Sequence, residues 1–311
     1  MTQTTQEAQN KAIFHRWFND VWNGGKYEVA QEVIAPTMLV HGAGGQPVEM
    51  GPDGLVGLVS TWRNAFPDGQ MYIDGLVAEG DLVAALLTWR GTHEADFYGI
   101  APTGKQVVCV SIGIDRMANN QVVAGWGELD MVGMMQQMGG LPMVGFGASA
   151  HGGSPEWGES SAPVEPTGPP SEENRSLMLR YVQARNDRDL DAMCEMIDDS
   201  SYVEHNPVLG ATDMESSMSA AKRLFDAMPD LRVEVDPGIV IAEGDFVAVH
   251  LIVTGTHTGA DFAGVSASGA KATWTATDVV RFANGKIVER WFCPDTLTLF
   301  QQLGVFGSPP A

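Results

Sequence analysis

Basic residues are scarce in this chain. Its 311 residues include 18 lysines and arginines against 39 aspartates and glutamates, which gives a formal net charge of -21 at pH 7. A surface this acidic repels phosphate backbones and anionic lipid head groups, and the sequence has no basic stripe that would offset the repulsion. We therefore expect neither a nucleic-acid partner nor binding to a membrane surface.

Cysteine is also scarce, and long apolar runs are missing. Cys109, Cys194 and Cys293 are an odd number without a CxxC pair, which favours reduced thiols and a cytoplasmic location over a disulfide framework. The most apolar stretch, residues 131–146, is interrupted by glycines and a proline, so we expect no transmembrane helix. The first ten residues are polar and do not predict a signal peptide.

The sequence contains an internal repeat. The segment Ala78-Glu-Gly-Asp81, followed by Gly91-Thr-His93, returns as Ala242-Glu-Gly-Asp245 and Gly255-Thr-His257 at the same internal spacing. Further matches are Phe66-Pro-Asp68 with Met228-Pro-Asp230, His41 with His205, Trp126 with Trp291, Asp130 with Asp295, and Gln136-Gln-Met-Gly139 with Gln301-Gln-Leu-Gly304. Agreement over so much of the chain indicates duplication of a complete folding unit.

The repeat divides the chain into two domains. We predict a first domain over residues 1–140, a linker rich in glycine, proline and serine over 141–171, and a second domain over 172–311. Each domain is long enough to bury its own core.

Both halves show the same order of elements. Apolar residues at helical spacing come first, over 13–21 and 177–182. Runs rich in β-branched and aromatic residues follow, separated by turn signals: 70–77, 82–92, 106–116 and 121–127, and then 232–241, 246–256, 272–282 and 286–292. This order predicts an α+β fold, in which N-terminal helices pack on one face of a curved antiparallel sheet that closes a cone around a pocket.

The order of these motifs resembles the SnoaL-like polyketide cyclase family of the NTF2-like, ketosteroid-isomerase-like superfamily. The resemblance includes the run Gly285-Lys-Ile-Val-Glu289-Arg-Trp291 and covers nearly all of both halves outside the linker. It implies two tandem cone-shaped NTF2-like domains that work by acid–base chemistry without a metal or organic cofactor. The superfamily fold also hosts isomerases, lyases, epoxide hydrolases and non-catalytic binding domains.

Asp130 and Asp295 match the position where cyclases of this family place an acid–base carboxylate, at the end of the last strand. A carboxylate in an apolar cone has a raised pKa, which suits it to proton transfer near neutral pH. The alternative is that each aspartate caps the helix that follows it. Glu128 lies two residues before Asp130, so an extended strand would place both side chains on one face and form a carboxylate pair. The alternative for Glu128 is exposure to solvent.

Histidine and tyrosine are further candidates for catalysis. His41 and His205 occupy corresponding places near the expected pocket mouth, as His93 and His257 do within Gly-Thr-His, and an imidazole can shuttle a proton or stabilise an oxyanion. Structural hydrogen bonds are the alternative for these histidines. Tyr98 could donate a hydrogen bond to a substrate carbonyl, and its counterpart in the repeat is Ala263.

Aromatic side chains are the candidates for binding a flat, ring-bearing substrate. Core packing is the alternative for most of them. The candidates are Trp17, Trp62, Trp89 and Trp126 in the first half and Tyr181, Trp274 and Trp291 in the second.

The function that we predict is a cofactor-independent acid–base enzyme of the cyclase, isomerase or lyase type. It would act on a small hydrophobic, aromatic carbonyl or hydroxyl compound, with the first domain favoured as the catalytic one. The alternatives are a non-catalytic ligand-binding or assembly module and an epoxide hydrolase. The two domains would pair within one chain as a pseudo-dimer, or with copies in other chains as a homo-oligomer.

Overall fold

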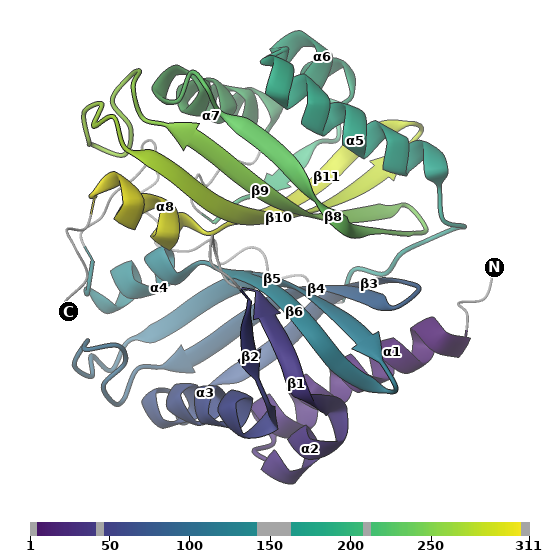
Figure 1. The fold of residues 1–311 in the computed structure, drawn as a ribbon, viewed down its shortest axis with the longest axis vertical. Helices are drawn as coiled ribbons and strands as arrows, with labels where there is room; N and C mark the ends of the chain where they lie inside the picture. The colour runs from purple at the N-terminus through teal and green to yellow at the C-terminus, as the bar shows by residue number, and fades with distance from the viewer. Residues whose placement is uncertain (1–4, 42–46, 142–162, 208–212, 306–311) are drawn as a thin grey trace.

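The computed structural model describes residues 5–41, 47–141, 163–207 and 213–305. Two domains face each other across their sheets, and each carries its main helices on the far side of its sheet (Figure 1). The predicted linker lies mostly outside the described residues. Among the residues that are described, no helix is long and apolar enough to cross a membrane.

The first domain begins with helices and ends with a run of strands. Its elements are α1 (Thr5–Arg16), the π-helix η1 (Trp17–Asn23), the 3-10 helix η2 (Tyr27–Val29), α2 (Ala30–Val33), β1 (Ile34–His41), β2 (Val48–Met50), α3 (Pro52–Ala65), β3 (Gln70–Glu79), β4 (Leu82–Thr92), β5 (Gln106–Ala118), β6 (Gln121–Leu129) and α4 (Met131–Met138).

The second domain repeats this order. Its elements are α5 (Glu172–Asp187), α6 (Leu190–Glu195), β7 (Val203–His205), α7 (Met214–Ala227), β8 (Arg232–Glu243), β9 (Phe246–Thr256), β10 (Lys271–Ala283), β11 (Lys286–Pro294) and α8 (Thr296–Leu303). The predicted α+β class is therefore confirmed.

Local chemistry explains where several elements begin and turn. The side chains of Ser171 and Asp213 cap α5 and α7 by accepting backbone hydrogen bonds at the first turn. The repeated Glu-Gly-Asp segments form the β3–β4 and β8–β9 turns, in which Gly80 and Gly244 have φ angles of 60° and 57°. Glycine adopts this left-handed conformation without steric cost, which explains its place in both turns.

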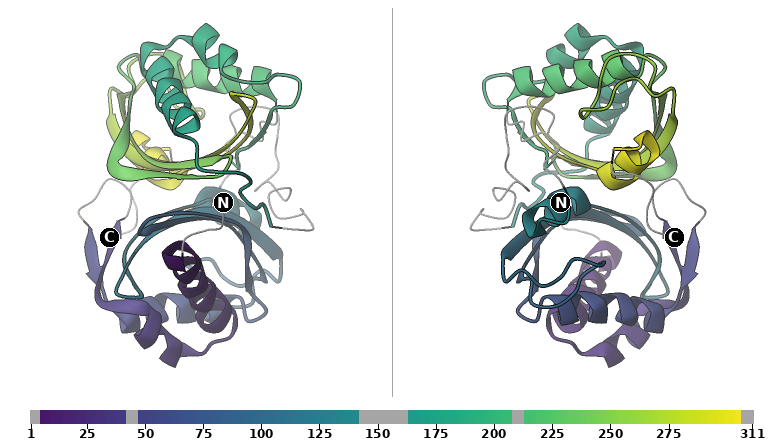
Figure 2. Two further views of the ribbon diagram at one scale, coloured as in Figure 1. Left: turned by 90° about the vertical axis from the view of Figure 1, so that its right-hand side faces the viewer. Right: turned by 90° about the vertical axis from the view of Figure 1, so that its left-hand side faces the viewer.

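The two sheets have matching topologies. Their strand orders are β2-β1-β6-β5-β4-β3 and β7-β11-β10-β9-β8. Hairpin neighbours pair antiparallel, whereas β1 pairs parallel with β6 and β7 pairs parallel with β11. The sheets are thus mixed rather than purely antiparallel. Each sheet curves around the first helix of its own domain, as Figure 2 shows, and encloses an apolar core beneath the helices.

The convex faces of the two sheets pack against each other. Because successive side chains of a strand point to opposite faces, each central strand sends alternate residues into its own cone and toward the other domain. The layer between the sheets is apolar and includes Leu86, Ile112, Ile114, Trp126, Ile241, Phe246, Ala248 and Trp291. Burial on both faces explains why β4 is buried along almost its whole length.

Candidate functional site

Asp130 and Asp295 begin the last helix of each domain. The Asp130 carboxylate accepts a hydrogen bond from the backbone N–H of Gly133 at 2.9 Å, and Asp295 accepts one from Thr298 at 2.9 Å. Burial raises the pKa of Asp130 to about 6, and its Oδ2 atom is buried without a hydrogen-bond partner among the described residues. Helix capping is thus visible in the structure, and an acid–base role for either aspartate stays a prediction.

Glu128 does not share a cone with Asp130, which corrects the expected carboxylate pair. Its Oε1 atom lies 3.1 Å from Nε2 of His250, and its Oε2 atom accepts a hydrogen bond from the Thr277 hydroxyl. Both partners belong to the second domain. The reason is that the side chain of Glu128 lies on the face of β6 that points toward the other sheet. Because β6 ends at Leu129, the alternation of an extended strand does not extend to Asp130.

His41 and His205 lie against tryptophans. The His41 ring stacks on Trp126 with centroids 4.3 Å apart, and burial lowers the pKa of His41. The His205 ring stacks on Trp291 with centroids 5.1 Å apart, and its Nε2 atom lies 2.9 Å from Oε1 of Glu289. Both tryptophans belong to the layer between the sheets, so these residues contribute to the joint between the domains.

His93 and Tyr98 differ in their exposure to solvent. His93 is 0% exposed, and its Nδ1 atom lies 3.1 Å from the Thr103 hydroxyl. Its counterpart His257 is also 0% exposed, with Nε2 placed 3.0 Å from the carbonyl oxygen of Ala260. Tyr98 is 60% exposed on a turn. Each histidine thus makes a local hydrogen bond, a catalytic role for either stays a prediction, and Tyr98 lies at the surface.

The predicted aromatic candidates separate into three groups. Trp17, Trp62 and Trp89 are buried in the core of the first domain, where the rings of Trp62 and Trp89 lie 5.3 Å apart. Trp126 and Trp291 lie between the sheets, as described above. Tyr181 and Trp274 line a cavity.

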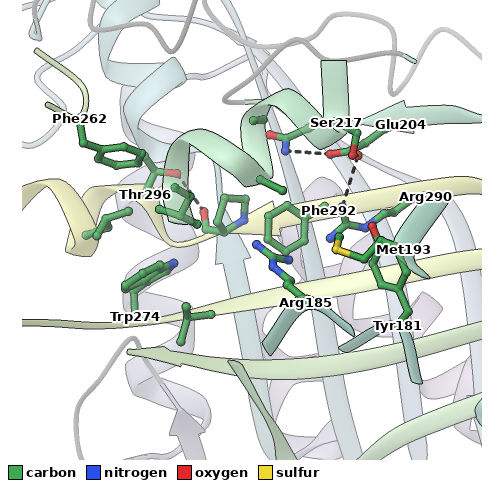
Figure 3. A pocket seen from close by; sticks show the side chains of 17 residues that line it. Tyr181, Arg185, Met193, Glu204, Ser217, Phe262, Trp274, Arg290, Phe292 and Thr296 are labelled. Carbon is green, nitrogen blue, oxygen red and sulfur yellow. Dashed lines mark hydrogen bonds and ion pairs between the residues drawn. The ribbon is translucent and has the colours of Figure 1, made fainter. Parts of the chain in front are cut away.

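That cavity lies inside the cone of the second domain (Figure 3). The space that the centres of water molecules can reach is about 80 Å³, and one water needs roughly 10–15 Å³ of such space. The cavity therefore has room for a small molecule. Its wall is mostly apolar and includes Met193, Leu224, Val253, Phe262, Phe292 and Leu299.

A buried charge cluster forms one side of the cavity. Arg290 donates hydrogen bonds to both carboxylate oxygens of Asp278, at 2.9 and 2.8 Å, and its Nη1 atom lies 3.3 Å from Oε2 of Glu204. Glu204 also accepts hydrogen bonds from Tyr202, Asn206 and Ser217. Burial by itself would raise the pKa of Glu204, but Arg290 and these donors hold it below its ordinary value. An ionised carboxylate with this many donors is a weak base.

Two donors in the cavity lack partners. Arg185 makes no hydrogen bond or ion pair with any described residue, and its Nε atom is buried. The hydroxyl of Tyr181 is likewise buried without a partner, and burial raises its pKa to about 12, so it stays protonated. Both residues belong to α5; in Figure 3 Arg185 lies beside Phe292, and Tyr181 lies beside Met193 and Arg290. They can donate to an oxygen atom of a bound molecule.

The first domain has a different interior group, the carboxyl of Asp115. On β5, Val110, Ile112 and Ile114 face the other sheet, so Asp115 faces its own cone. It is partly buried and makes no hydrogen bond or ion pair with any described residue. Burial raises the pKa of Asp115 to about 7. This carboxyl is half ionised near neutral pH, which suits it to accept and return a proton.

Glycines surround Asp115 on this face of the sheet. Gly125 is its neighbour on β6, and a Cβ atom there would lie 2.6 Å from Cε of Met38 and 2.8 Å from Oδ1 of Asp115, so only glycine fits beside this carboxyl. Two residues farther along the same face, Gly127 is exposed and has open space where a side chain would lie. A Cβ atom at Gly113, which pairs with Gly127, would make ordinary contacts at 3.9 Å with Leu87 and Trp126.

The cone interiors are where the two domains differ most. The inward positions that carry Arg185, Glu204, Asp278 and Arg290 in the second domain carry Trp22, Val40, Gly113 and Gly125 in the first, and Asp115 corresponds to Val280. Sequence reasoning concentrated on the positions that repeat and so missed these residues. The available signal was a charged residue at an apolar position of the helical or strand pattern. Among the described residues, no group of three metal-ligating side chains could hold a metal ion.

A protein-family model described as the SnoaL-like polyketide cyclase matches the chain twice, over residues 12–138 and 175–303. The chain belongs to this family. Its two domains are SnoaL-like domains with the NTF2-like α+β fold, as the motif order implied. A comparison with curated proteins gave no match.

Solved structures of single-domain length are similar to parts of the chain. AclR from Streptomyces galilaeus, a proposed hydroxylase, is 29% identical to this chain, with a TM-score of 0.41. The match covers 44% of this chain and 85% of AclR. A proposed polyketide cyclase from Acidithiobacillus ferrooxidans has 30% identity, 44% and 97% coverage, and a TM-score of 0.40. IdmH from Streptomyces antibioticus, also a proposed polyketide cyclase, has 28% identity, 42% and 99% coverage, and a TM-score of 0.39.

Proposed function

We propose that this SnoaL-like protein is a cofactor-independent enzyme that moves protons on a hydrophobic carbonyl or hydroxyl compound, as a cyclase, isomerase or lyase. The observation that carries the proposal is the isolated carboxyl of Asp115 in the first cone. Each of these reactions needs a base that removes a proton from carbon or oxygen.

The comparison with the second cone supports the choice of Asp115. Glu204 lines the cavity there, but four groups donate to it or pair with it, and its pKa lies below the ordinary value. Asp115 has no such donors, and its pKa is about 7. A base works best when its pKa is close to the pH of the reaction, so Asp115 is the better proton acceptor.

Asp130 is a second candidate carboxyl in the same domain. It occupies the family's acid–base position, and one of its oxygens is already committed to Gly133. We assign it the role of helix cap, because its free oxygen is buried whereas Asp115 is partly accessible.

Hydrogen exchange tests the proposal without knowledge of the natural substrate. The full chain is incubated in D2O with 2-acetonaphthone or phenylacetone, and loss of the proton next to the carbonyl is followed by NMR. We expect exchange above the buffer rate for the wild type and for Asp261→Asn, a substitution at an exposed position. We expect loss of that excess rate in Asp115→Asn. Equal rates in the two variants would contradict the assignment of Asp115.

A non-catalytic binding module is the second candidate function. The cavity of the second domain favours it, because its unpartnered donors can hold a ligand while its carboxylate is a weak base. This candidate predicts saturable binding of a small apolar compound with no exchange by the wild type. Epoxide hydrolysis would instead incorporate oxygen from labelled water into a diol product, which mass spectrometry detects.

A further inference from the structure

Arg185 lines the cavity of the second domain and makes no hydrogen bond or ion pair with any described residue. It follows Tyr181 by one helical turn on α5, so both side chains project from the same face of the helix (Figure 3). Its guanidinium carbon lies 5.4 Å from the centre of the Phe292 ring. Burial lowers the pKa of Arg185, and the nearby charge of Arg290 lowers it further. The side chain is partly buried and its Nε atom is buried, so a ligand acceptor would supply a hydrogen-bond partner that no described residue supplies.

The carboxylate that lines the cavity, Glu204, and the neighbouring carboxylate of Asp278 already accept hydrogen bonds. Both carboxylate oxygens of Asp278 accept hydrogen bonds from Arg290. The Glu204 carboxylate accepts from three polar side chains and also lies against Arg290. Therefore a ligand that complements this cavity has to bring an acceptor rather than a donor.

The arrangement of charge favours an acidic acceptor. Glu204, Asp278 and Arg290 together carry one net negative charge, and Arg185 balances that charge without forming an ion pair with either carboxylate. A ligand carboxylate at hydrogen-bonding distance from Arg185 would be nearer to it than Glu204 or Asp278 are. Since the Coulomb energy falls with distance, the nearest pair dominates. A planar guanidinium also matches the two oxygens of a carboxylate.

The remainder of the cavity suits an apolar ring. Trp274, Phe262 and Met193 supply flat or adaptable apolar surface. The hydroxyl of Tyr181 is a second donor near Arg185. The corresponding residues of the first domain are Trp17 and Trp22, which provide neither the hydroxyl nor the cation.

We infer that the second domain binds a small, ring-bearing carboxylic acid, with the ligand's carboxylate held by Arg185 and the Tyr181 hydroxyl. This site is separate from the proton-transfer group proposed in the first domain, and its existence does not depend on that proposal. The duplicated chain thus has a basic carboxyl in one cone and an acid-binding cation in the other.

Isothermal titration of the full chain tests the inference. The probes are benzoate and 2-naphthoate, each compared with its neutral amide, benzamide or 2-naphthamide. We expect at least one acid to bind more than about tenfold more tightly than its amide, since charge-assisted hydrogen bonds are the stronger ones. We expect Arg185→Met to weaken binding of that acid roughly 10- to 100-fold and to change amide binding little.

Arg180→Met is the matched control, because Arg180 is exposed on the same helix and its loss changes the net charge equally. It should bind the acid as the wild type does, and so should Asp115→Asn. Tyr181→Phe should weaken binding of the acid by a smaller factor. It serves as the second test of the site in case Arg185→Met does not fold. The inference is overturned if an amide binds as tightly as its acid, if Arg185→Met and Tyr181→Phe both match the Arg180→Met control, or if neither acid binds at millimolar concentration.

Discussion

Glu79 and Glu243 make reciprocal contacts across the two domains. Glu79 ends β3 and accepts a hydrogen bond from the backbone N–H of Ala242 at 2.8 Å, whereas Glu243 ends β8 and accepts one from Ala78 at 2.6 Å. Each carboxylate therefore binds the backbone next to the other. This is the pattern of a two-fold symmetric interface, here formed within one chain.

The same two glutamates also bind cations at corresponding positions. Glu79 pairs with Arg175 at 2.6 Å, and Glu243 pairs with Lys11 at 2.9 Å. The first cation lies in the second domain and the other in the first. The repeated Ala-Glu-Gly-Asp segment thus joins the domains, which supports the expectation of a pseudo-dimer. Assembly of several chains stays a prediction.

Substitution of Glu79 should loosen the joint between the domains. In Glu79→Ala the N–H of Ala242 loses its acceptor and Arg175 loses its ion pair across the joint while keeping its bond to Val240, and we expect a loss of about 1–3 kcal/mol in the free energy of unfolding. Urea unfolding followed by circular dichroism measures this. Glu234→Ala, at an exposed position of β8, should change stability by less than about 0.5 kcal/mol. Equal stability of the two variants would contradict a role in joining the domains.

His250 should make stability depend on pH. It is buried between Glu128 and Asp236, at 3.1 and 3.0 Å. Burial opposes its charge, but the two carboxylates prevail and raise the pKa of His250 above 6.5. Because the folded state binds this proton more tightly, the contribution is complete below the unfolded pKa and is lost as pH rises through the folded value.

Glu128→Gln removes one of these partners and should reduce the dependence. Unfolding free energies at about pH 6 and about pH 9 should differ more for the wild type than for the variant. A parallel pH dependence in the two proteins would show that the Glu128 contact does not set the protonation of His250. Glu234→Gln, the same substitution at an exposed position of β8, serves as a control and should retain the wild-type dependence.

Asp115 should cost stability at neutral and higher pH. Its pKa is raised from 3.8 to about 7 because the folded protein disfavours the buried charge. The folded state therefore binds more protons than the unfolded state between these values, and stability falls as pH rises through that window. Asp115→Asn should gain roughly 1–3 kcal/mol at about pH 8 and less at about pH 4. A loss of stability at both pH values would indicate that the carboxylate makes favourable contacts.

Gly133 should tolerate no side chain. A Cβ atom there would lie 2.1 Å from Oδ2 of Asp130, whereas a Cβ atom at Gly57 on α3 would meet nothing within 4 Å. We expect Gly133→Ala to destabilise the protein by about 1–3 kcal/mol and Gly57→Ala to stabilise it by about 0.5–1 kcal/mol. Thermal unfolding measures both. Stabilisation by Gly133→Ala would mean that Asp130 can leave the helix cap freely.

Residues that repeat in both domains do not include the groups that we assign to the candidate sites. Matching positions such as Asp130 with Asp295 and His93 with His257 are catalytic candidates by sequence, and in the structure they cap helices or lie in buried turns. The groups now assigned to chemistry or binding, Asp115 and Arg185, have no charged counterpart in the other domain. Duplication preserves what the fold needs, so the residues that differ between copies carry the information about each pocket.

The amino-acid sequence is enough to predict the two α+β domains, the four hairpin-linked strands of each, and their family. Hydrophobic periodicity, glycine at the turns and residues that cap helices act between neighbours in the chain, so they can be recognised without coordinates. The three-dimensional fold was needed to show that Glu128 faces the other domain, that Trp62 and Trp89 fill a core, and that Arg185 forms no ion pair with any described residue. Those facts depend on which faces of two sheets meet and on distances between residues far apart in sequence.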